Sequence, residues 1–399
     1  MVRQKNTKFG LFCYDTENIG DEIQSIAAKR FLPRIDYYIN RDNIDDTNFK
    51  ANETVKLIMN GWYIEPSLKD GSIHWPPKNN AIDPLLTSVH VSFLNGSLKT
   101  FDTAESRTFL QKHAPVGARD RATEQFLKTI GVPSFFSGCL TLTLIPDKKI
   151  KKSDFILAVD ISPRVLQAIK KRTSRKILAI NTVHNRNYTT EERFDLAKYW
   201  LYLYQTAHCI ITTRLHAMLP GLAFGTPVIA ITGKDAERFS GLIELVNHYT
   251  PINFIRNNQI SVDNPLKNPD LFHPIRNSLV RACSEFTNYD SKSSFLDGLT
   301  IQELLNKPTF SSIISKSVEE AFNEKHLNLG HQQELSRLYN EENRLKNEIS
   351  QLQDEREHFQ TIIAEKDSKI TSLSNPSIKS ASKALLRSIK HSCFKTNSG

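Results

Sequence analysis

The chain has 399 residues, of which 39% are hydrophobic, and a formal net charge of +9. This length predicts two domains that each bury a core, and no apolar stretch is long enough to span a bilayer, so we expect a cytoplasmic protein. Basic residues are not interleaved with aromatic ones in the part expected to fold, which argues against nucleic acid as a partner. The five cysteines lie far apart without a CxxC pair, which favours reduced thiols over disulfides or a metal centre.

Residues 1–150 alternate apolar runs with helical patterns. Strands are expected at 9–14, 55–59, 88–93 and 115–119. A turn at Asn18 and Gly20 opens the first helix, and another helix is expected at 122–130. Strands that alternate with helices through short links are typical of a parallel, doubly wound α/β domain.

Residues 151–290 repeat this alternation after a basic, polar stretch at 146–153, which we interpret as a hinge between two domains. Strands are expected at 155–160, 176–183, 209–211 and 228–231, and helices at 163–171, 190–206, 214–224 and 274–286. Thr190 is predicted to begin the capping pattern of the second of these helices, with Arg193 at its third position. Residues 291–330 are predicted to form a linker with a helical extension.

The most informative stretch runs from His208 to Thr232, because it combines two apolar strands with a helix that begins on basic residues. Thr212 and Thr213 suit the N-cap of this helix, which would place Arg214 and His216 in its first turn. Free backbone N–H groups and the positive end of the helix dipole favour an anion there. Ligands bind at the carboxyl ends of strands in open α/β sheets, so the pair predicts a phosphorylated or carboxylated ligand.

Two further segments follow the α/β part. Residues 331–373 carry apolar side chains in heptad spacing and predict a coiled coil that joins copies of the chain into a homo-oligomer. The alternative is a single amphipathic helix that folds back on its own domain. Residues 374–399 contain five basic residues and no acid, and we interpret them either as a peripheral membrane contact or as a solvated, disordered tail.

Several strings, in the same order along the chain, resemble the polysaccharide pyruvyl transferase family. They are Asn18 to Glu22, Asn60-Gly61-Trp62, Ser88 to His90, Gly117 to Asp120, Ser137 to Leu144 and Thr213 to Ile231. The resemblance implies a GT-B-like α/β fold, with two Rossmann-like, doubly wound domains that face each other across a cleft. It also implies transfer of a pyruvyl group from phosphoenolpyruvate to a saccharide or lipid-linked saccharide, usually with ketal formation, in surface polysaccharide biosynthesis.

The resemblance and the residue chemistry together assign roles. Arg119 and Arg214, each after a strand, are expected to bind the phosphate and carboxylate of the donor, and His216 to transfer protons as the catalytic residue. An alternative for Arg119 is a structural ion pair with Asp120, Asp102 or Glu105. The family's basic residue after the last strand falls near Arg238, which we assign to the donor together with His90. Asn18, Asp21 and His184 are assigned to the acceptor, although Asp21 could instead cap a helix.

Phosphoenolpyruvate enters as a substrate, and we expect no cofactor and no metal, because the chain lacks HExxH and P-loop strings. Two alternative functions remain open at this point. One is a GT-B-type glycosyltransferase that uses a nucleotide sugar, and the other is a degenerate transferase that acts as a scaffold through its coiled coil.

Overall fold

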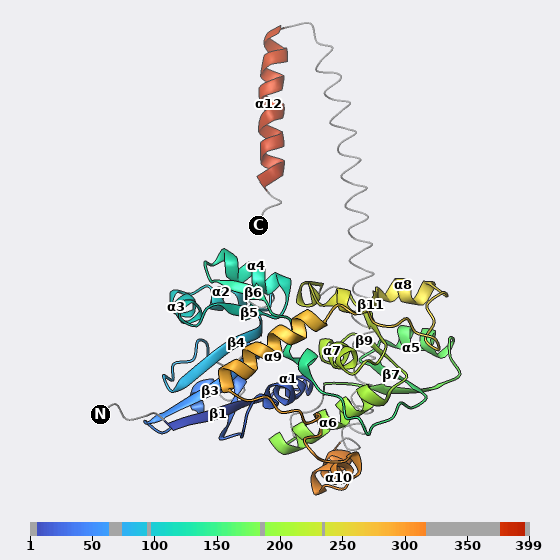
Figure 1. The fold of residues 1–399 in the computed structure, drawn as a ribbon. Helices are drawn as coiled ribbons and strands as arrows, with labels where there is room; N and C mark the ends of the chain where they lie inside the picture. The colour runs from blue at the N-terminus through green and yellow to red at the C-terminus, as the bar shows by residue number, and fades with distance from the viewer. Residues whose placement is uncertain are drawn as a thin grey trace. The chain divides into compact units, whose positions relative to one another are not determined.

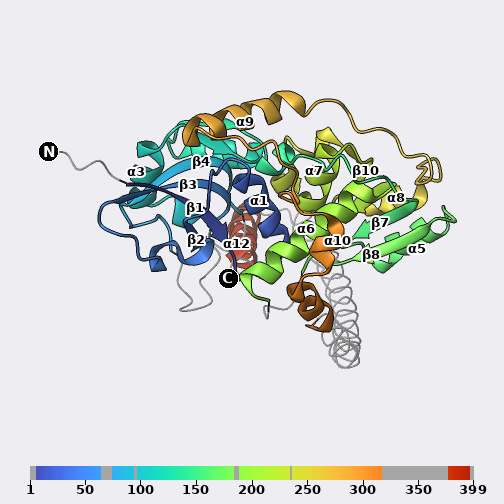
Figure 2. The same ribbon diagram turned by 60° about the horizontal axis from the view of Figure 1, so that its bottom comes forward.

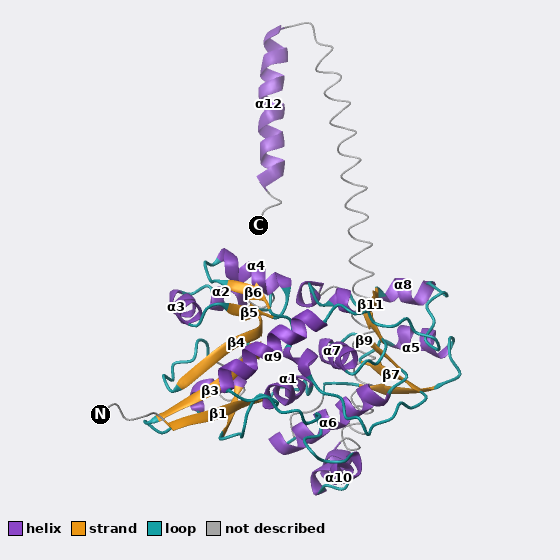
Figure 3. Cartoon of the chain, in the orientation of Figure 1, coloured by secondary structure: helices purple, strands orange, loops and turns teal. Residues whose placement is uncertain are grey.

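The computed structural model describes residues 6–63, 74–93, 97–183, 188–233, 236–316 and 376–395. The chain divides into two compact units, residues 1–318 and residues 319–399. The first unit contains two separate β-sheets whose faces are covered by helices (Figures 1 and 3). An α/β fold with two parallel sheets, as predicted from the alternation of strands and helices, is therefore confirmed.

The first sheet has six parallel strands in the order β2-β1-β3-β4-β5-β6. In chain order they are β1 (Asn6–Cys13), β2 (Tyr37–Asn40), β3 (Glu53–Trp62), β4 (Ile82–His90), β5 (Val116–Ala118) and β6 (Ser134–Phe136). The sequence pattern missed β2, a strand of only four residues, and it began β4 six residues too late. Both errors have the same cause, because neither Tyr37–Asn40 nor the start of β4 shows a continuous apolar run.

The second sheet has five parallel strands in the order β11-β10-β9-β7-β8. They are β7 (Phe155–Val159), β8 (Lys176–Ile180), β9 (Cys209–Thr212), β10 (Val228–Ile231) and β11 (Asn247–Tyr249). The four strands predicted in this region are present, and β11 adds a short strand at one edge.

The helices lie between the strands and after them. They are α1 (Gly20–Lys29), α2 (Ser97–Phe101), α3 (Ala104–Lys112), α4 (Arg121–Thr129), α5 (Pro163–Lys170), α6 (Thr190–Thr206), α7 (Leu215–Ala223), α8 (Pro251–Arg256), α9 (His273–Thr287) and α10 (Ile301–Leu305), with 3-10 turns at η1 (Arg41–Asp46), η2 (Leu140–Thr143), η3 (Ala236–Phe239) and η4 (Ile243–Leu245). One large core contains buried side chains of α1, α6, α7 and α9 and of both sheets. Smaller cores cover the other face of each sheet.

The predicted bounds 190–206 of helix α6 are confirmed, but the predicted N-cap residues of α6 and α7 are wrong by one or two positions. Helix α6 is capped by Thr189, whose hydroxyl accepts from the Glu192 backbone N–H while the Glu192 carboxylate accepts from the Thr189 N–H. This reciprocal capping box forms at Thr189 and not at Thr190, because a box that began at Thr190 would need Arg193 to accept a hydrogen bond, which it cannot do. Helix α7 has Arg214 at its N-cap, in an extended conformation, whereas Thr212 and Thr213 had been expected there.

The carboxyl edges of the two sheets meet. The loop after β1 bonds to the loop after β8, where the Ile19 N–H donates to the Thr182 carbonyl over 3.1 Å. The segment after β5 bonds to the segment after β10, where the Arg121 N–H donates to the Ser240 carbonyl over 3.0 Å. Side chains at the strand ends of one sheet therefore come close to those of the other.

A buried ion pair links α1 of the first sheet to α6 of the second. The two helices lie side by side in Figure 2, and the Glu22 carboxylate accepts two hydrogen bonds from the Arg193 guanidinium, including one of 3.1 Å from Nη2. Both side chains are at most 2% exposed. A pair so completely desolvated requires both partners, because either charge alone would be left buried.

Replacement of Glu22 by glutamine should therefore destabilise the fold. The Glu22→Gln variant keeps the shape of the side chain but leaves the Arg193 charge uncompensated, so we expect the free energy of unfolding to fall by about 3 kcal/mol. Denaturant titration of the full chain measures this. The matched control is Glu191→Gln, since Glu191 is 69% exposed and lies 3.6 Å from Lys307. An equal loss in both variants would contradict the prediction.

The second unit is described only for α12 (Pro376–Lys395), a helix within the segment that the sequence showed to be basic. The coiled coil predicted at 331–373 lies outside the described residues, so it stays a prediction, and so does homo-oligomerisation through it. In the part of the chain that the structure describes, no helix has the length and apolar character needed to cross a membrane.

Candidate functional site

The carboxyl edge of the first sheet gathers three side chains that carry chemistry. Trp62 and His90 are the last residues of the neighbouring strands β3 and β4, and Arg119 directly follows β5. Because parallel strands end at one edge, residues far apart in sequence become neighbours there. The Trp62 and His90 rings lie 5.7 Å apart, edge to face.

His90 is held by a buried carboxylate. Its Nδ1 lies 2.6 Å from Oδ2 of Asp120, which also accepts the Thr123 backbone N–H through Oδ1 over 2.9 Å. Burial and the nearby Arg119 cation lower the pKa of His90 to about 4, despite the Asp120 carboxylate. His90 is therefore neutral at physiological pH, and Asp120 fixes the orientation of its ring.

Arg119 is almost completely buried, with 1% of its surface exposed. Its Nε lies 3.5 Å from Oδ2 of Asp120, which is an ion pair longer than a hydrogen bond. Nε and Nη2 of Arg119 are buried and make no hydrogen bond to any residue that the structure describes. Of the structural alternatives, Asp120 is thus the one that Arg119 approaches, but the pairing leaves donors of the guanidinium unused.

Arg214 and His216 lie in different surroundings. Arg214 donates from Nε to Oδ2 of Asp160 over 2.8 Å and is 34% exposed. His216 is 8% exposed, and its buried Nε2 has no hydrogen-bond partner among the described residues. Burial, together with the Arg119 cation, lowers the pKa of His216 to about 3. Arg214 and His216, two positions apart in the sequence, therefore have separate surroundings: the Arg119 cation acts on His216, and Arg214 is bonded to Asp160.

Helix α1 comes very close to His216. A Cβ atom at Gly20 would lie 3.3 Å from Nδ1 of His216 and 3.0 Å from the side-chain oxygen of Asn18. Glycine at this position therefore lets the first turns of α1 and α7 approach each other. The close approach places His216 between the two sheets.

The predicted acceptor residues are engaged within the protein or lie outside the described part. The side-chain oxygen of Asn18 accepts the Gly20 N–H over 3.1 Å, and Asn18 forms an isolated antiparallel bridge with Val183. Asp21 accepts hydrogen bonds from Gln24, Thr16 and Arg41. His184 lies outside the described residues. Acceptor binding by these three residues stays a prediction.

We call His90, Arg119, His216 and Arg238 the Arg–His cluster. Arg238, on η3, belongs to it because its cation contributes to lowering the pKa of both histidines. Several of the buried polar atoms that lack a hydrogen-bond partner in the described part of the chain belong to this cluster or to the strands β3 and β4 beside it: Arg119 Nε and Nη2, His216 Nε2, Trp62 Nε1 and Ser88 Oγ. Such atoms are rare in proteins, and perturbed histidines beside cations are frequent at functional sites, so the cluster has the chemistry to bind a polar, anionic ligand.

Two residues near the carboxyl ends of the strands, Asp160 in the second sheet and Ser88 in the first, were given no role in the sequence analysis. Asp160 follows β7 in the left-handed region, with a φ of 51°, and accepts hydrogen bonds from Arg214, Thr182 N and Thr182 Oγ1. Ser88, in β4, is fully buried with a φ of 54°. Positive φ is unfavourable for both residue types, and such strain occurs preferentially at functional sites. The polar residue directly after the apolar run 155–159 was the available signal for Asp160.

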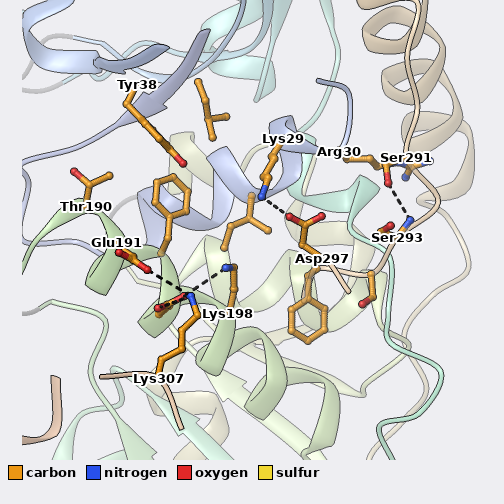
Figure 4. A pocket seen from close by; sticks show the side chains of 16 residues that line it. Lys29, Arg30, Tyr38, Thr190, Glu191, Lys198, Ser291, Ser293, Asp297 and Lys307 are labelled. Atoms are coloured by element: carbon orange, nitrogen blue, oxygen red, sulfur yellow. Dashed lines mark hydrogen bonds and ion pairs between the residues drawn. The ribbon is translucent and has the colours of Figure 1, made fainter. Parts of the chain in front are cut away.

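A separate cavity of about 450 Å³ lies between α1, α6 and the segment that follows α9 (Figure 4). Its lining includes Lys29, Tyr38, Lys198, Asp297 and Lys307. Figure 4 shows Lys29 paired with Asp297. Lys198 and Lys307 both donate to the Asp195 carboxylate. Of the predicted site residues that the structure describes, none lines this cavity. Among the residues described, no group of three His, Cys, Asp or Glu side chains could hold a metal ion.

Comparison with known proteins gives one family match. A family model described as polysaccharide pyruvyl transferase matches residues 18–235, a range that contains His90, Arg119, Arg214 and His216 but not Arg238. No curated protein matches the chain in sequence.

Several solved structures are similar at low identity. An uncharacterized protein from Klebsiella pneumoniae is 16% identical, covers 58% of this chain and 87% of its own, and has a TM-score of 0.37. UDP-GlcNAc 2-epimerase from Methanocaldococcus jannaschii is 12% identical, and the match covers 70% of this chain and 99% of the epimerase, with a TM-score of 0.38. The wall teichoic acid polymerase TagF is 11% identical, and the match covers 77% of this chain and 89% of TagF, with a TM-score of 0.30.

Proposed function

Because the chain belongs to the polysaccharide pyruvyl transferase family, we propose that it transfers a pyruvyl group from phosphoenolpyruvate to a saccharide or lipid-linked saccharide of a surface polysaccharide. The observation that carries the donor assignment is the group of unpaired, buried donors around Arg119 and His216. Such donors are costly in an empty site and are satisfied when an anion with several oxygens enters.

In this proposal the Arg–His cluster binds the donor. Phosphoenolpyruvate carries a phosphate and a carboxylate, and the planar guanidinium of Arg119 can donate two parallel hydrogen bonds to either group. Arg238 adds a second cation from the other sheet. Arg214 enters the donor site only if the anion replaces Asp160 as the partner of its guanidinium, so we give it a secondary role.

The reaction then proceeds through protonation of the donor's double bond. A proton delivered to the methylene carbon makes the methyl group and leaves an oxocarbenium-like carbon. A sugar hydroxyl attacks this carbon, and the proton of the hydroxyl passes to a base. The C–O bond to phosphate then breaks, and phosphate leaves with the electron pair. The second hydroxyl attacks the same carbon and closes the ring to a ketal, and its proton passes to the departing phosphate. We assign the other proton transfers to His216. No metal or further cofactor enters this scheme.

The test is direct. Purified full-length protein is incubated with phosphoenolpyruvate and a panel of saccharides, and phosphate release is measured together with the gain of one pyruvyl group by mass spectrometry. Phosphate release that depends on a saccharide supports the proposal. Thermal stabilisation by a sugar nucleotide and none by phosphoenolpyruvate would instead support a GT-B-type glycosyltransferase. Stabilisation by neither donor would support the scaffold.

A further inference from the structure

Helix α12 combines exposed apolar side chains with a cationic surface. It spans Pro376–Lys395, and the residues from 374 to the end of the chain include Lys379, Lys383, Arg387, Lys390 and Lys395 but no acid. Leu385 is 65% exposed and Ile389 is 46% exposed. Nothing in the described part of the chain covers these two side chains, so α12 exposes them as an apolar surface.

The two kinds of side chain occupy different faces. Ala381, Leu385 and Ile389 are spaced by four residues, which places them along one side of a helix. Lys383 and Arg387 are also spaced by four residues, but they begin two positions later and therefore fall on the other side, with Lys390 next to them. An apolar stripe opposite a basic face is the pattern of a helix that lies in a membrane interface.

The charge selects among the occupants that could cover such a stripe. A second copy of the helix, packed stripe to stripe, would cover the apolar side chains but would leave both basic faces, which carry no carboxylate on α12, without a counter-charge. A bilayer with anionic headgroups attracts the cations and also accepts the apolar side chains, while the long lysine stems reach the headgroup level. The 20 residues of α12 include too many charges to cross the bilayer, in agreement with the absence of a membrane-spanning helix among the described residues.

We propose that α12 binds flat on an anionic lipid surface, with Leu385 and Ile389 inserted and Lys383, Arg387 and Lys390 at the headgroups. The proposal is independent of the reaction that the first unit catalyses. Each basic residue near such a surface contributes about 1 kcal/mol, which corresponds to about a fivefold change in affinity.

Vesicle sedimentation with the full chain tests the proposal. We expect binding to vesicles of phosphatidylglycerol in phosphatidylcholine and at least tenfold weaker binding to phosphatidylcholine alone. Raising the salt from about 0.1 M to about 1 M shortens the screening length from about 10 to about 3 Å and should weaken the binding. The double variant Lys383→Gln and Arg387→Gln should lose more than tenfold in affinity, and Leu385→Ser with Ile389→Ser should lose a similar amount while keeping every charge.

The controls separate insertion from other contacts. Lys383→Arg keeps the charge and Ala384→Ser lies on neither face, so both should bind as the unchanged protein does. Equal binding to neutral and anionic vesicles, or none to either, would overturn the proposal. Undiminished binding by the Leu385→Ser and Ile389→Ser variant would also overturn it, because the contact would then be electrostatic without insertion. If this variant changed the oligomeric state and left vesicle binding unaltered, the apolar stripe would belong to a contact between copies.

Discussion

Replacing Arg119 by methionine should lower kcat/KM for phosphoenolpyruvate by about a hundredfold or more while leaving the protein folded. The guanidinium is buried, its Nε and Nη2 have no hydrogen-bond partner among the described residues, and its cation dominates the field at both histidines after burial itself. A group that is costly in the free protein and is satisfied by the ligand contributes to binding rather than to stability.

The stability of the Arg119→Met variant distinguishes a binding role from a structural one, because loss of a structural residue would unfold the protein. Asp120 keeps the hydrogen bonds from His90 and from the Thr123 N–H, so loss of the 3.5 Å pair with Arg119 leaves it partnered. Methionine has a similar length and no buried donors. Because Asp120 keeps two hydrogen bonds, we expect the free energy of unfolding to fall by less than the loss of about 3 kcal/mol expected for Glu22→Gln. Denaturant titration and steady-state kinetics on the same preparation measure the two effects separately.

Two further variants sharpen the comparison. Arg119→Lys keeps the charge but loses the planar fork and should fall between the unchanged protein and Arg119→Met in kcat/KM. Arg107→Met is the matched control, because Arg107 is 46% exposed and pairs with Asp102 at 3.3 Å on the surface. If Arg119→Met were fully active, or if it unfolded while Arg107→Met did not, Arg119 would be a structural residue.

The fold was predictable where local pattern and tertiary environment agree. The strand, helix and strand between His208 and Thr232 lie within one or two residues of their predicted bounds, because buried parallel strands are continuous apolar runs and Gly225 ends the helix. The short strand β2 was not predictable in this way. It is defined by its pairing with β1, and pairing over a distance leaves little trace in four residues.

For the candidate site, the sequence pattern indicated that its residues follow strands, but it did not indicate their side-chain contacts. Both Arg119 and His216 follow strands that end at an edge of a sheet, and each was found from that pattern. The split of Arg214 from His216 depends on Asp160, which is 54 residues away in the sequence and reaches Arg214 only because β7 and β9 are neighbours. Likewise, the ion pair between Asp21 and Arg41 forms because Arg41 lies in the 3-10 turn η1 directly after β2, and the sequence pattern had not predicted β2. Side-chain partners set by strand order lie beyond what periodicity can show.

Donor binding should load His216 with a proton. In the free protein burial and the Arg119 cation hold the pKa of His216 at about 3, so the ring is neutral near pH 7 and has no proton to give. A bound trianion or dianion beside Arg119 offsets that cation and favours the charged imidazolium, which raises the pKa. Between the free and the bound pKa the complex therefore holds one proton more than the separate partners.

Calorimetry in buffers with different heats of ionisation measures this proton directly. We expect net uptake of protons when phosphoenolpyruvate binds to the full chain between pH 5 and 7, because a neighbouring negative charge raises the pKa of His216. The same coupling predicts that kcat falls as the pH rises through the pKa of the complex, since kcat reports groups in the bound state. A pH profile of kcat does not identify which group titrates, and the calorimetric proton uptake, measured on the same variants, does.

The two histidines of the cluster provide each other's control. His216→Gln keeps a polar side chain of similar size but cannot be protonated, and it should abolish both the proton uptake and the turnover. His90→Gln should keep the uptake, because the pKa of His90, at about 4, belongs to a ring that already bonds to Asp120. If proton uptake persisted in His216→Gln and disappeared in His90→Gln, the proton would be assigned to His90 instead of His216. Binding without any uptake would show that the proton reaches the methylene carbon from a group outside the Arg–His cluster.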